Sequence, residues 1–443
     1  MKREKDFLAS WFSILNHSNI KYAILRNYDS LPYSCGGSDI DIWVKKEDYK
    51  DFIKITSKCA TANDGVLASY TPDDTCPRII YQACGWGVQL DVHIGAAIHK
   101  GVPYIDDETI EEHIIEYNGV KILSKEIDIL ISFLKEVLNN KKCKEEYCAR
   151  AAELVDTATK EDINRFLKAF SQNARQRIIE VLKNRDFTKT TIQKLGIQCS
   201  KDIQSLGSKI KYRINQLKKI TRIFKQPGYT IAFLGTDGSG KSTVINALTP
   251  ILNEAFHNGI RYEHMRPNHL PSLAVFMGKK KADEPTGVCS NPHGSKPSGF
   301  AGSLLRVSYY MIDYTWGYFR KVFLDKAFKT HIWLFDRYYY DYLIDPRRGR
   351  ISLPKWIINF YGFFVPTPDI ILCLGGDPEK IYRRKPETSL EEVTRQTNVL
   401  KSFCNSNKKA VWIDTTTTPQ ESIDAAMFAI QKMMEKRYSK TKL

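Results

Sequence analysis

The sequence predicts an α/β protein built from three consecutive parts. With 443 residues the chain is too long for a single hydrophobic core. Strand-like runs between turn residues predict an α+β part at residues 1–125, and apolar residues at helical spacing predict a helical segment with a basic linker at 126–225. Apolar strands that alternate with helices predict a parallel sheet flanked by helices at 226–443.

The individual elements of the first two parts follow from hydrophobic periodicity. In the first part, apolar runs with β-branched residues predict strands at 20–25, 39–44 and 88–93. In the second part, the apolar residues between Ile127 and Leu134 recur at helical spacing and predict a helix.

The most specific motif of the chain is the stretch GTDGSGKST, which matches the phosphate-binding P-loop pattern GxxxxGKS. An apolar strand at 229–234 precedes it, and Val244–Leu252 can form the helix that follows. Backbone N–H groups and the helix N-terminus would then face a triphosphate. Lys241 would reach its β- and γ-phosphates, and Ser242 would hold Mg²⁺. The residues expected to bind ATP are Gly235, Gly238, Ser239, Gly240, Lys241, Ser242 and Thr243.

Three later features indicate phosphoryl transfer. An apolar strand ends at Asp336, whose carboxylate would lie near the phosphates, and Arg337 follows as a phosphate-binding cation. A run of three cations at 383–385 fits a lid that neutralises the transferring charge, although the same run also fits a solvated helix end. A last strand at 410–414 and the turn at 415–419 would lie beside an adenine.

Together these motifs resemble the thymidylate kinase family of P-loop kinases, over the last half of the chain. Asp336, Arg337 and Tyr338 match its Asp-Arg-aromatic motif, and the family's loop acid, which contacts the acceptor's sugar hydroxyl, corresponds to Asp237. The loop has no arginine, so the resemblance implies that a lid arginine supplies the catalytic cation. The catalytic residues it implies are Asp237, Lys241, Asp336, Arg337, Arg383 and Arg384.

The acceptor side matches the family less well. Arg266 can hold an acceptor phosphate, Tyr309 and Tyr338 would bind the acceptor, and a Pro/Gly/Ser-rich segment at 279–303 is expected to be disordered or a lid. The charged segment at 341–348 resembles divergent thymidylate kinase-like proteins of bacterial surface-polysaccharide gene clusters, whose acceptor need not be a nucleotide.

The first part carries an acidic pattern of its own. Asp39 and Asp41 alternate onto one face of a strand, and Asp91 lies on another strand, so the three carboxylates would bind divalent metal ions. The pattern resembles the nucleotidyltransferase superfamily. That superfamily has a Gly-Ser pair ahead of the first acid, where this chain has Arg26 among larger residues, so an active transferase, a binding or regulatory module and turn-capping acids all stay open.

The net charge of +16 favours anionic partners. A basic amphipathic stretch at 203–225 would lie on an anionic membrane surface, or pack against a neighbouring domain with its basic face in water. It lacks the interleaved aromatic residues of a nucleic-acid surface, so no specific nucleic-acid partner is expected. The N-terminal residues lack the apolar run of a signal peptide. The ten cysteines are scattered with no CxxC pair, which indicates reduced thiols and predicts a cytoplasmic protein.

The motifs thus predict ATP- and Mg²⁺-dependent phosphoryl transfer, and the resemblance implies a nucleoside monophosphate, dTMP-like, or a related small molecule as the acceptor. The alternative is nucleotidyl transfer at the N-terminal acids with the P-loop part supplying or sensing nucleotide, in surface-polysaccharide synthesis. A third hypothesis is an interaction protein that is gated by ATP binding and does not hydrolyse or transfer phosphate. Oligomeric state is not predicted.

Overall fold

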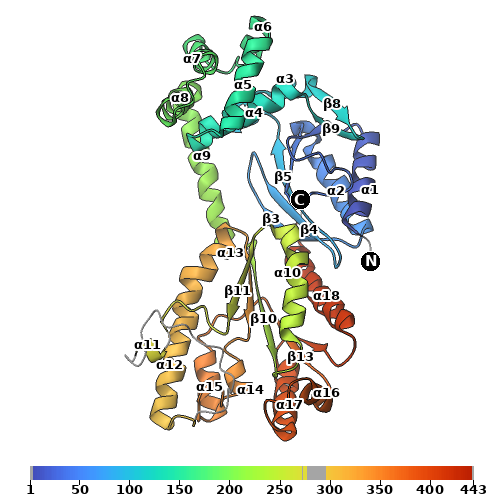
Figure 1. Cartoon of the computed structure of the whole chain (residues 1–443), viewed down its shortest axis with the longest axis vertical. Coiled ribbons are helices and arrows are strands. Elements are labelled where there is room, and N and C mark those ends of the chain that lie inside the picture. Colours follow the sequence, from blue (N-terminus) through green and yellow to red (C-terminus); the bar gives the residue numbers. More distant parts are fainter. Residues whose placement is uncertain (1–2, 272, 277–295, 442–443) are drawn as a thin grey trace. The chain divides into compact units, whose positions relative to one another are not determined.

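A computed structural model describes residues 3–271, 273–276 and 296–441, which form two compact units, Met1–Thr221 and Arg222–Lys440 (Figure 1). The helices predicted at 126–225 do not stand apart: up to Thr221 they belong to the first unit. Residues 277–295, most of the predicted lid or disordered segment, lie outside the described residues.

The N-terminal unit contains a mixed seven-stranded sheet in the order β3-β4-β5-β2-β1-β9-β8 and a separate hairpin of β6 and β7. The predicted strands are confirmed with small shifts at their ends. The strands are β1 Tyr22–Ile24, β2 Ile40–Val44, β3 Val66–Thr71, β4 Arg78–Gln82, β5 Gly87–Ile94, β6 Ala97–His99, β7 Val102–Ile105, β8 Ile114–Tyr117 and β9 Val120–Leu123. The helices are α1 Glu4–His17, α2 Tyr49–Ala62, α3 Asp107–Glu112, α4 Lys125–Lys135, α5 Glu145–Thr157, α6 Lys160–Phe166, α7 Gln172–Lys183, α8 Lys189–Ile203 and α9 Leu206–Lys218.

Strand register brings the N-terminal acids together. β2 and β5 are parallel and pair Asp41 with Asp91, while β4 runs antiparallel to β5 and pairs Arg78 with Asp91. Two apolar clusters cover the sheet. One contains α1 and α2, and the other contains α4, α5, α7 and α8, which is why the predicted helical segment folds with the first 125 residues.

Helix α9 has no buried residue, and its apolar positions form an exposed stripe. The exposed members are Leu206, Ile210, Ile214 and Leu217. Lys218 is 2.8 Å from Asp74, so part of the basic face is paired within the same unit. Contact of 203–225 with an anionic membrane surface stays a prediction. Among the helices of the described residues, none is both long and apolar enough to cross a membrane.

The C-terminal unit is a five-stranded parallel sheet in the order β11-β12-β10-β13-β14, with helices packed around it. Strands β10, β12 and β13 are buried along their whole length, as expected for a parallel sheet covered on both faces. The strands are β10 Tyr229–Gly235, β11 Ile260–His264, β12 Ile332–Asp336, β13 Ile370–Gly375 and β14 Ala410–Asp414. The helices are α10 Lys241–Phe256, α11 Leu273–Phe276, α12 Phe300–Gly317, α13 Leu324–Phe328, α14 Asp341–Ile344, α15 Lys355–Gly362, α16 Pro378–Arg384, α17 Leu390–Ser406 and α18 Pro419–Tyr438.

This architecture confirms the predicted α/β class with a parallel sheet flanked by helices. Because all five strands run in the same direction, their carboxyl ends meet at one edge of the sheet. The register places His264 beside Asp336 across β11 and β12, and Phe233 beside Asp336 across β10 and β12. The glycine-rich loop therefore starts at the edge where β12 presents its terminal acid.

Candidate phosphoryl-transfer site

The glycine-rich loop joins β10 directly to α10 and has the backbone shape that phosphate binding requires. Gly238 and Gly240 both have a φ of +80°, where an L side chain is strained. A Cβ on Gly235 would come within 2.6 Å of the carbonyl oxygen of Leu374, so the loop also packs too closely for a side chain there. Helix α10 begins at Lys241, and its N-terminal N–H groups are available to an anion.

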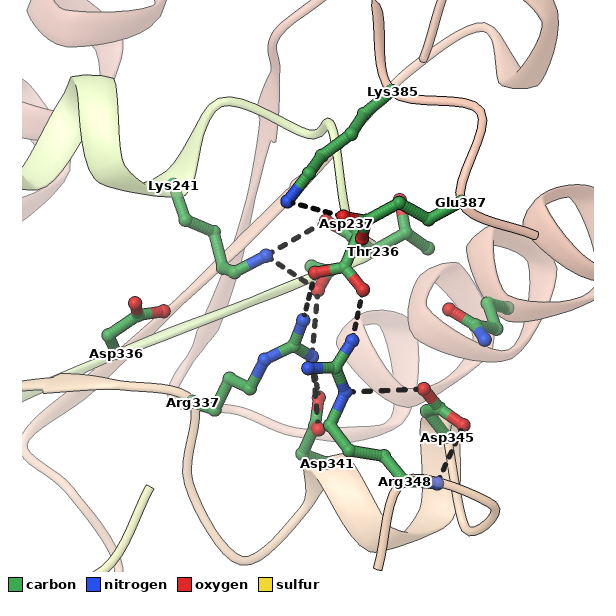
Figure 2. A network of polar contacts seen from close by, with 12 residues as sticks. Thr236, Asp237, Lys241, Asp336, Arg337, Asp341, Asp345, Arg348, Lys385 and Glu387 are labelled. Carbon is green, nitrogen blue, oxygen red and sulfur yellow. Dashed lines mark hydrogen bonds and ion pairs between the residues drawn. The ribbon is translucent and has the colours of Figure 1, made fainter. Parts of the chain in front are cut away.

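Lys241 is buried and donates hydrogen bonds to the carbonyl oxygens of Gly235 and Thr236, at 3.0 and 2.8 Å (Figure 2). Burial, with the positive charge of Arg337, lowers the pKa of Lys241 to about 7. The side chain thus ties the start of the loop to the first residue of α10.

A cavity of about 850 Å³ lies in front of the loop. Ser242 and Thr243 line it at the start of α10, and Asp336 lines it at the end of β12. Three polar atoms nearby are buried and have no hydrogen-bond partner among the described residues: Asp336 Oδ1, Thr236 Oγ1 and Ser239 Oγ. Buried polar atoms without partners are rare in proteins, so these atoms fit a site that is completed by a bound ligand.

The carboxylate of Asp336 lies at the carboxyl end of β12 and contacts two side chains of β11. Tyr262 donates a hydrogen bond to its Oδ2 at 3.2 Å, and His264 Nδ1 lies 3.5 Å from the same oxygen. Burial alone would raise the pKa of Asp336, but His264 and Lys241 outweigh it and hold that pKa below its ordinary value. Asp336 is therefore ionised at neutral pH, with one oxygen left for a ligand.

Asp237, the loop acid, is held by two arginines (Figure 2). Arg337 Nη2 donates to its Oδ1 at 2.7 Å, and Arg348 donates to Oδ2. Arg337 Nη1 also donates to both carboxylate oxygens of Asp341, at 2.8 and 3.0 Å, and Asp341 is fully buried. Burial opposes the charge of Arg337, yet Asp341 and Asp237 keep its pKa raised, so this guanidinium is always charged.

The three cations of the predicted lid differ from one another. Arg384 lines the cavity and donates to the carbonyl oxygen of Thr415 at 2.7 Å, and Lys385 lines the cavity while paired with Glu387 at 3.0 Å. Arg383 points elsewhere: its side chain is 78% exposed and lies 3.5 Å from Glu379. These residues end helix α16 rather than forming an extended loop.

The predicted acceptor residues are not part of the cavity lining. Arg266 forms a buried ion pair with Asp313 at 2.9 Å. Tyr309 donates to the carbonyl oxygen of Pro271 at 2.7 Å. Tyr338 is fully buried and donates to the carbonyl oxygen of Pro366 at 2.6 Å. Each of the three side chains supports the structure beside the site.

Three residues that the sequence did not single out do line the cavity: Tyr262, His264 and Arg348. The first two alternate on strand β11, so strand periodicity could have suggested that they share one face. Arg348 reaches Asp237 from 111 positions away, and no local pattern indicates that contact.

In the N-terminal unit each of the predicted metal-binding acids is near a basic group. Asp41 accepts from Arg26, and Asp91 forms a two-pronged contact with Arg78 at 2.8 and 2.9 Å. Asp39 lies 3.9 Å from Arg26. Within the described residues, no group of three or more His, Cys, Asp or Glu side chains could hold a metal ion.

The parallel sheet and the glycine-rich loop that joins β10 to α10 are consistent with a P-loop kinase fold for the C-terminal unit. Among solved structures, the chain is similar to thymidylate kinase from Ehrlichia chaffeensis, at 18% identity and a TM-score of 0.29, covering 42% of this chain and 88% of that one. It is also similar to thymidylate kinase from Candida albicans, at 17% identity and a TM-score of 0.33, covering 47% and 92%. No protein-family model and no curated protein matches the sequence.

Proposed function

We propose that the C-terminal unit transfers the γ-phosphoryl group of ATP to a nucleoside monophosphate, dTMP-like, or a related small acceptor. The observation that carries the proposal is the convergence of Lys241, the α10 N-terminus, Asp336 and Arg384 on one cavity. These groups are the parts that phosphoryl transfer needs: a cradle for phosphates, an acid at the end of the neighbouring strand, and cations for the transferring charge.

In this reaction an acceptor oxygen bonds to the γ-phosphorus while the bond to the β,γ-bridging oxygen breaks, which releases ADP. Lys241 and the loop N–H groups would bind the β- and γ-phosphates. Arg384 and Lys385 would neutralise charge that develops on the transferred group. Mg²⁺, which the Ser242 hydroxyl and the Asp336 carboxylate fit, would supply further charge neutralisation when bound.

Asp237 and Arg337 would position the acceptor. The carboxylate and the guanidinium that bond to each other in this structure would then contact the acceptor instead. Arg337 keeps Asp341 as a second partner when it turns toward an acceptor, so it need not be left without a counter-charge. Nucleotidyl transfer at Asp39, Asp41 and Asp91 is not favoured, because basic side chains hold Asp41 and Asp91 directly and Arg26 lies beside Asp39.

The test is ADP release from ATP and Mg²⁺ across a panel of nucleoside monophosphates, with the phosphorylated product identified by mass. We expect at least one acceptor to stimulate ADP release, and Lys241→Ala to lower the stimulated rate about 10²–10³-fold. Lys408→Ala, at an exposed lysine away from the cavity, is the matched control. ATP binding without turnover under any acceptor would instead support an ATP-gated interaction protein and would reject the kinase.

A further inference from the structure

A second cavity lies inside the N-terminal unit, beside the buried carboxylate of Asp41. Three basic side chains converge on this one acid. Arg26 donates to its Oδ2, His93 Nε2 lies 3.2 Å from Oδ1, and Lys135 Nζ lies 3.9 Å from Oδ1. Arg26, His93 and Lys135 come from three separate segments, and all three line the cavity. Basic groups therefore outnumber the acid they surround.

The carboxylates around this cavity do not fit a divalent metal site. Both oxygens of Asp41 already face basic groups, and both oxygens of Asp91 are bound by the guanidinium of Arg78. A metal ion would have to displace the bases from two acids. This arrangement differs from the metal-binding set that the resemblance to nucleotidyltransferases implies.

The rest of the cavity wall is partly apolar. Apolar side chains there include Leu25, Trp43, Tyr104, Ile110 and Ile131, and polar ones include Thr75, Ser132 and Asn139. The cavity has a volume of about 150 Å³. That volume is comparable to a cavity that holds benzene. The cavity thus offers space for one ring, partly against apolar side chains, next to a basic end.

A second acid, Glu136, also lines the cavity and accepts a hydrogen bond from the neutral amide of Asn140 at 2.8 Å. Three basic side chains, Arg26, His93 and Lys135, therefore share the cavity wall with two acids. Arg26 and Lys135 are 46% and 37% exposed at the side chain, so an incoming molecule can reach them. An anionic group at this end would gain charge-assisted hydrogen bonds while its apolar body leaves water.

We infer that this cavity binds a small organic anion, one ring in size, through Arg26 and Lys135 and without a divalent metal ion. The carboxylate of Asp41 holds the bases in place in the absence of the anion and competes with it for them. The site is separate from the phosphoryl-transfer reaction and does not depend on it.

The experiment is calorimetric titration of the full-length Lys241→Ala protein, whose P-loop is weakened, with phenyl phosphate in EDTA. We expect binding in EDTA, stronger than that of inorganic phosphate, which lacks the ring. Arg26→Gln and Lys135→Gln should each weaken binding about tenfold or more, the usual effect of losing one charged hydrogen bond. Asp41→Asn should strengthen binding, because the competing charge is removed.

Arg177→Gln is the matched control, because Arg177 lies outside the cavity lining and forms an exposed ion pair with Glu180 on α7. Thermal unfolding of each variant checks that it is folded. A metal site gives the opposite pattern: binding that needs Mg²⁺ or Mn²⁺ and is lost in Asp41→Asn. That pattern, an absence of phenyl phosphate binding in EDTA, or affinities unchanged in both Arg26→Gln and Lys135→Gln would overturn the inference.

Discussion

The two units each place a buried aspartate among basic side chains, but they build the surrounding site differently. In the C-terminal unit the groups proposed to bind an anion are mostly backbone N–H groups and one lysine within nine consecutive residues, 235–243. In the N-terminal unit they are side chains from separate segments, at Arg26, His93 and Lys135, around Asp41. The first site can be recognised from a local motif, whereas the second depends on how strands and helices pack. The stability of the two units should also change by different amounts when one charged side chain is removed.

The largest expected effect concerns stability and compares the buried aspartates Asp341 of the C-terminal unit and Asp41 of the N-terminal unit. Arg337→Gln leaves the fully buried Asp341 without its counter-charge and should lower the free energy of unfolding of the C-terminal unit by about 3–5 kcal/mol. Arg26→Gln should have a smaller effect on the N-terminal unit, because Asp41 keeps His93 and Lys135. Urea unfolding of both variants measures the difference, and equal losses would remove the contrast.

The next effect concerns catalysis and assumes the proposed kinase reaction. Lys241→Ala removes the ammonium group that the loop carbonyls now hold, and turnover should fall about 10²–10³-fold. Asp41→Asn should leave turnover unchanged, because it acts in the other unit. The rate of ADP release with saturating acceptor is the measurement. A loss of turnover in Asp41→Asn would show that the two sites are coupled.

A third effect is a pH dependence that comes from His93 in the N-terminal unit. Burial lowers the pKa of His93, but Cys76 and Asp41 outweigh it and raise that pKa to about 9, above the ordinary value of about 6.5. The contribution of His93 to stability is therefore complete below pH 6.5 and is lost as pH rises through about 9.

The unfolding free energy of wild type minus that of His93→Gln should shrink by roughly 1–3 kcal/mol between pH 6 and pH 9.5. Denaturant unfolding at a series of pH values measures this gap. The control is His264→Gln, whose side chain beside Asp336 is 57% exposed. A gap that stays constant with pH would contradict the assignment of a charged His93.

The smallest effect distinguishes neighbouring arginines of α16. Arg384→Gln should lower turnover about tenfold, because Arg384 lines the cavity and would contact the transferring charge. Arg383→Gln should leave turnover nearly unchanged, because its side chain is exposed and pairs with Glu379. The two rates are measured under identical conditions. The reverse order would mean that α16 reorganises when nucleotide binds.

Sequence alone was sufficient where structure is local. The strand, glycine-rich loop and helix around Lys241 follow from consecutive residues, and so does the acid at the end of β12. The sequence also predicted a functional role for Asp39, Asp41 and Asp91. It did not indicate that Arg78 lies beside Asp91 or that Lys135 lies beside Asp41. Those contacts depend on strand register and on a helix packed against the sheet, which hydrophobic periodicity does not specify.

The acceptor side shows the same limit. Arg266 has the residue type and position in sequence expected of a phosphate ligand, but tertiary packing gives it a buried partner, Asp313, on α12. Tyr262 and His264 reach the cavity because β11 is an edge strand whose carboxyl end lies next to Asp336. Which of two nearby side chains faces a site is decided by the rotation of the strand, and a single sequence leaves that undetermined.

The hydrogen bonds from Lys241 to the carbonyl oxygens of Gly235 and Thr236 have a kinetic consequence. Under the proposed function, nucleotide entry would exchange these two hydrogen bonds of Lys241 for contacts to phosphate oxygens. The association rate should then be set by diffusion and by attraction to the basic surface, as in other electrostatically steered encounters. Differences in affinity among nucleotides would arise mainly from how slowly each one leaves.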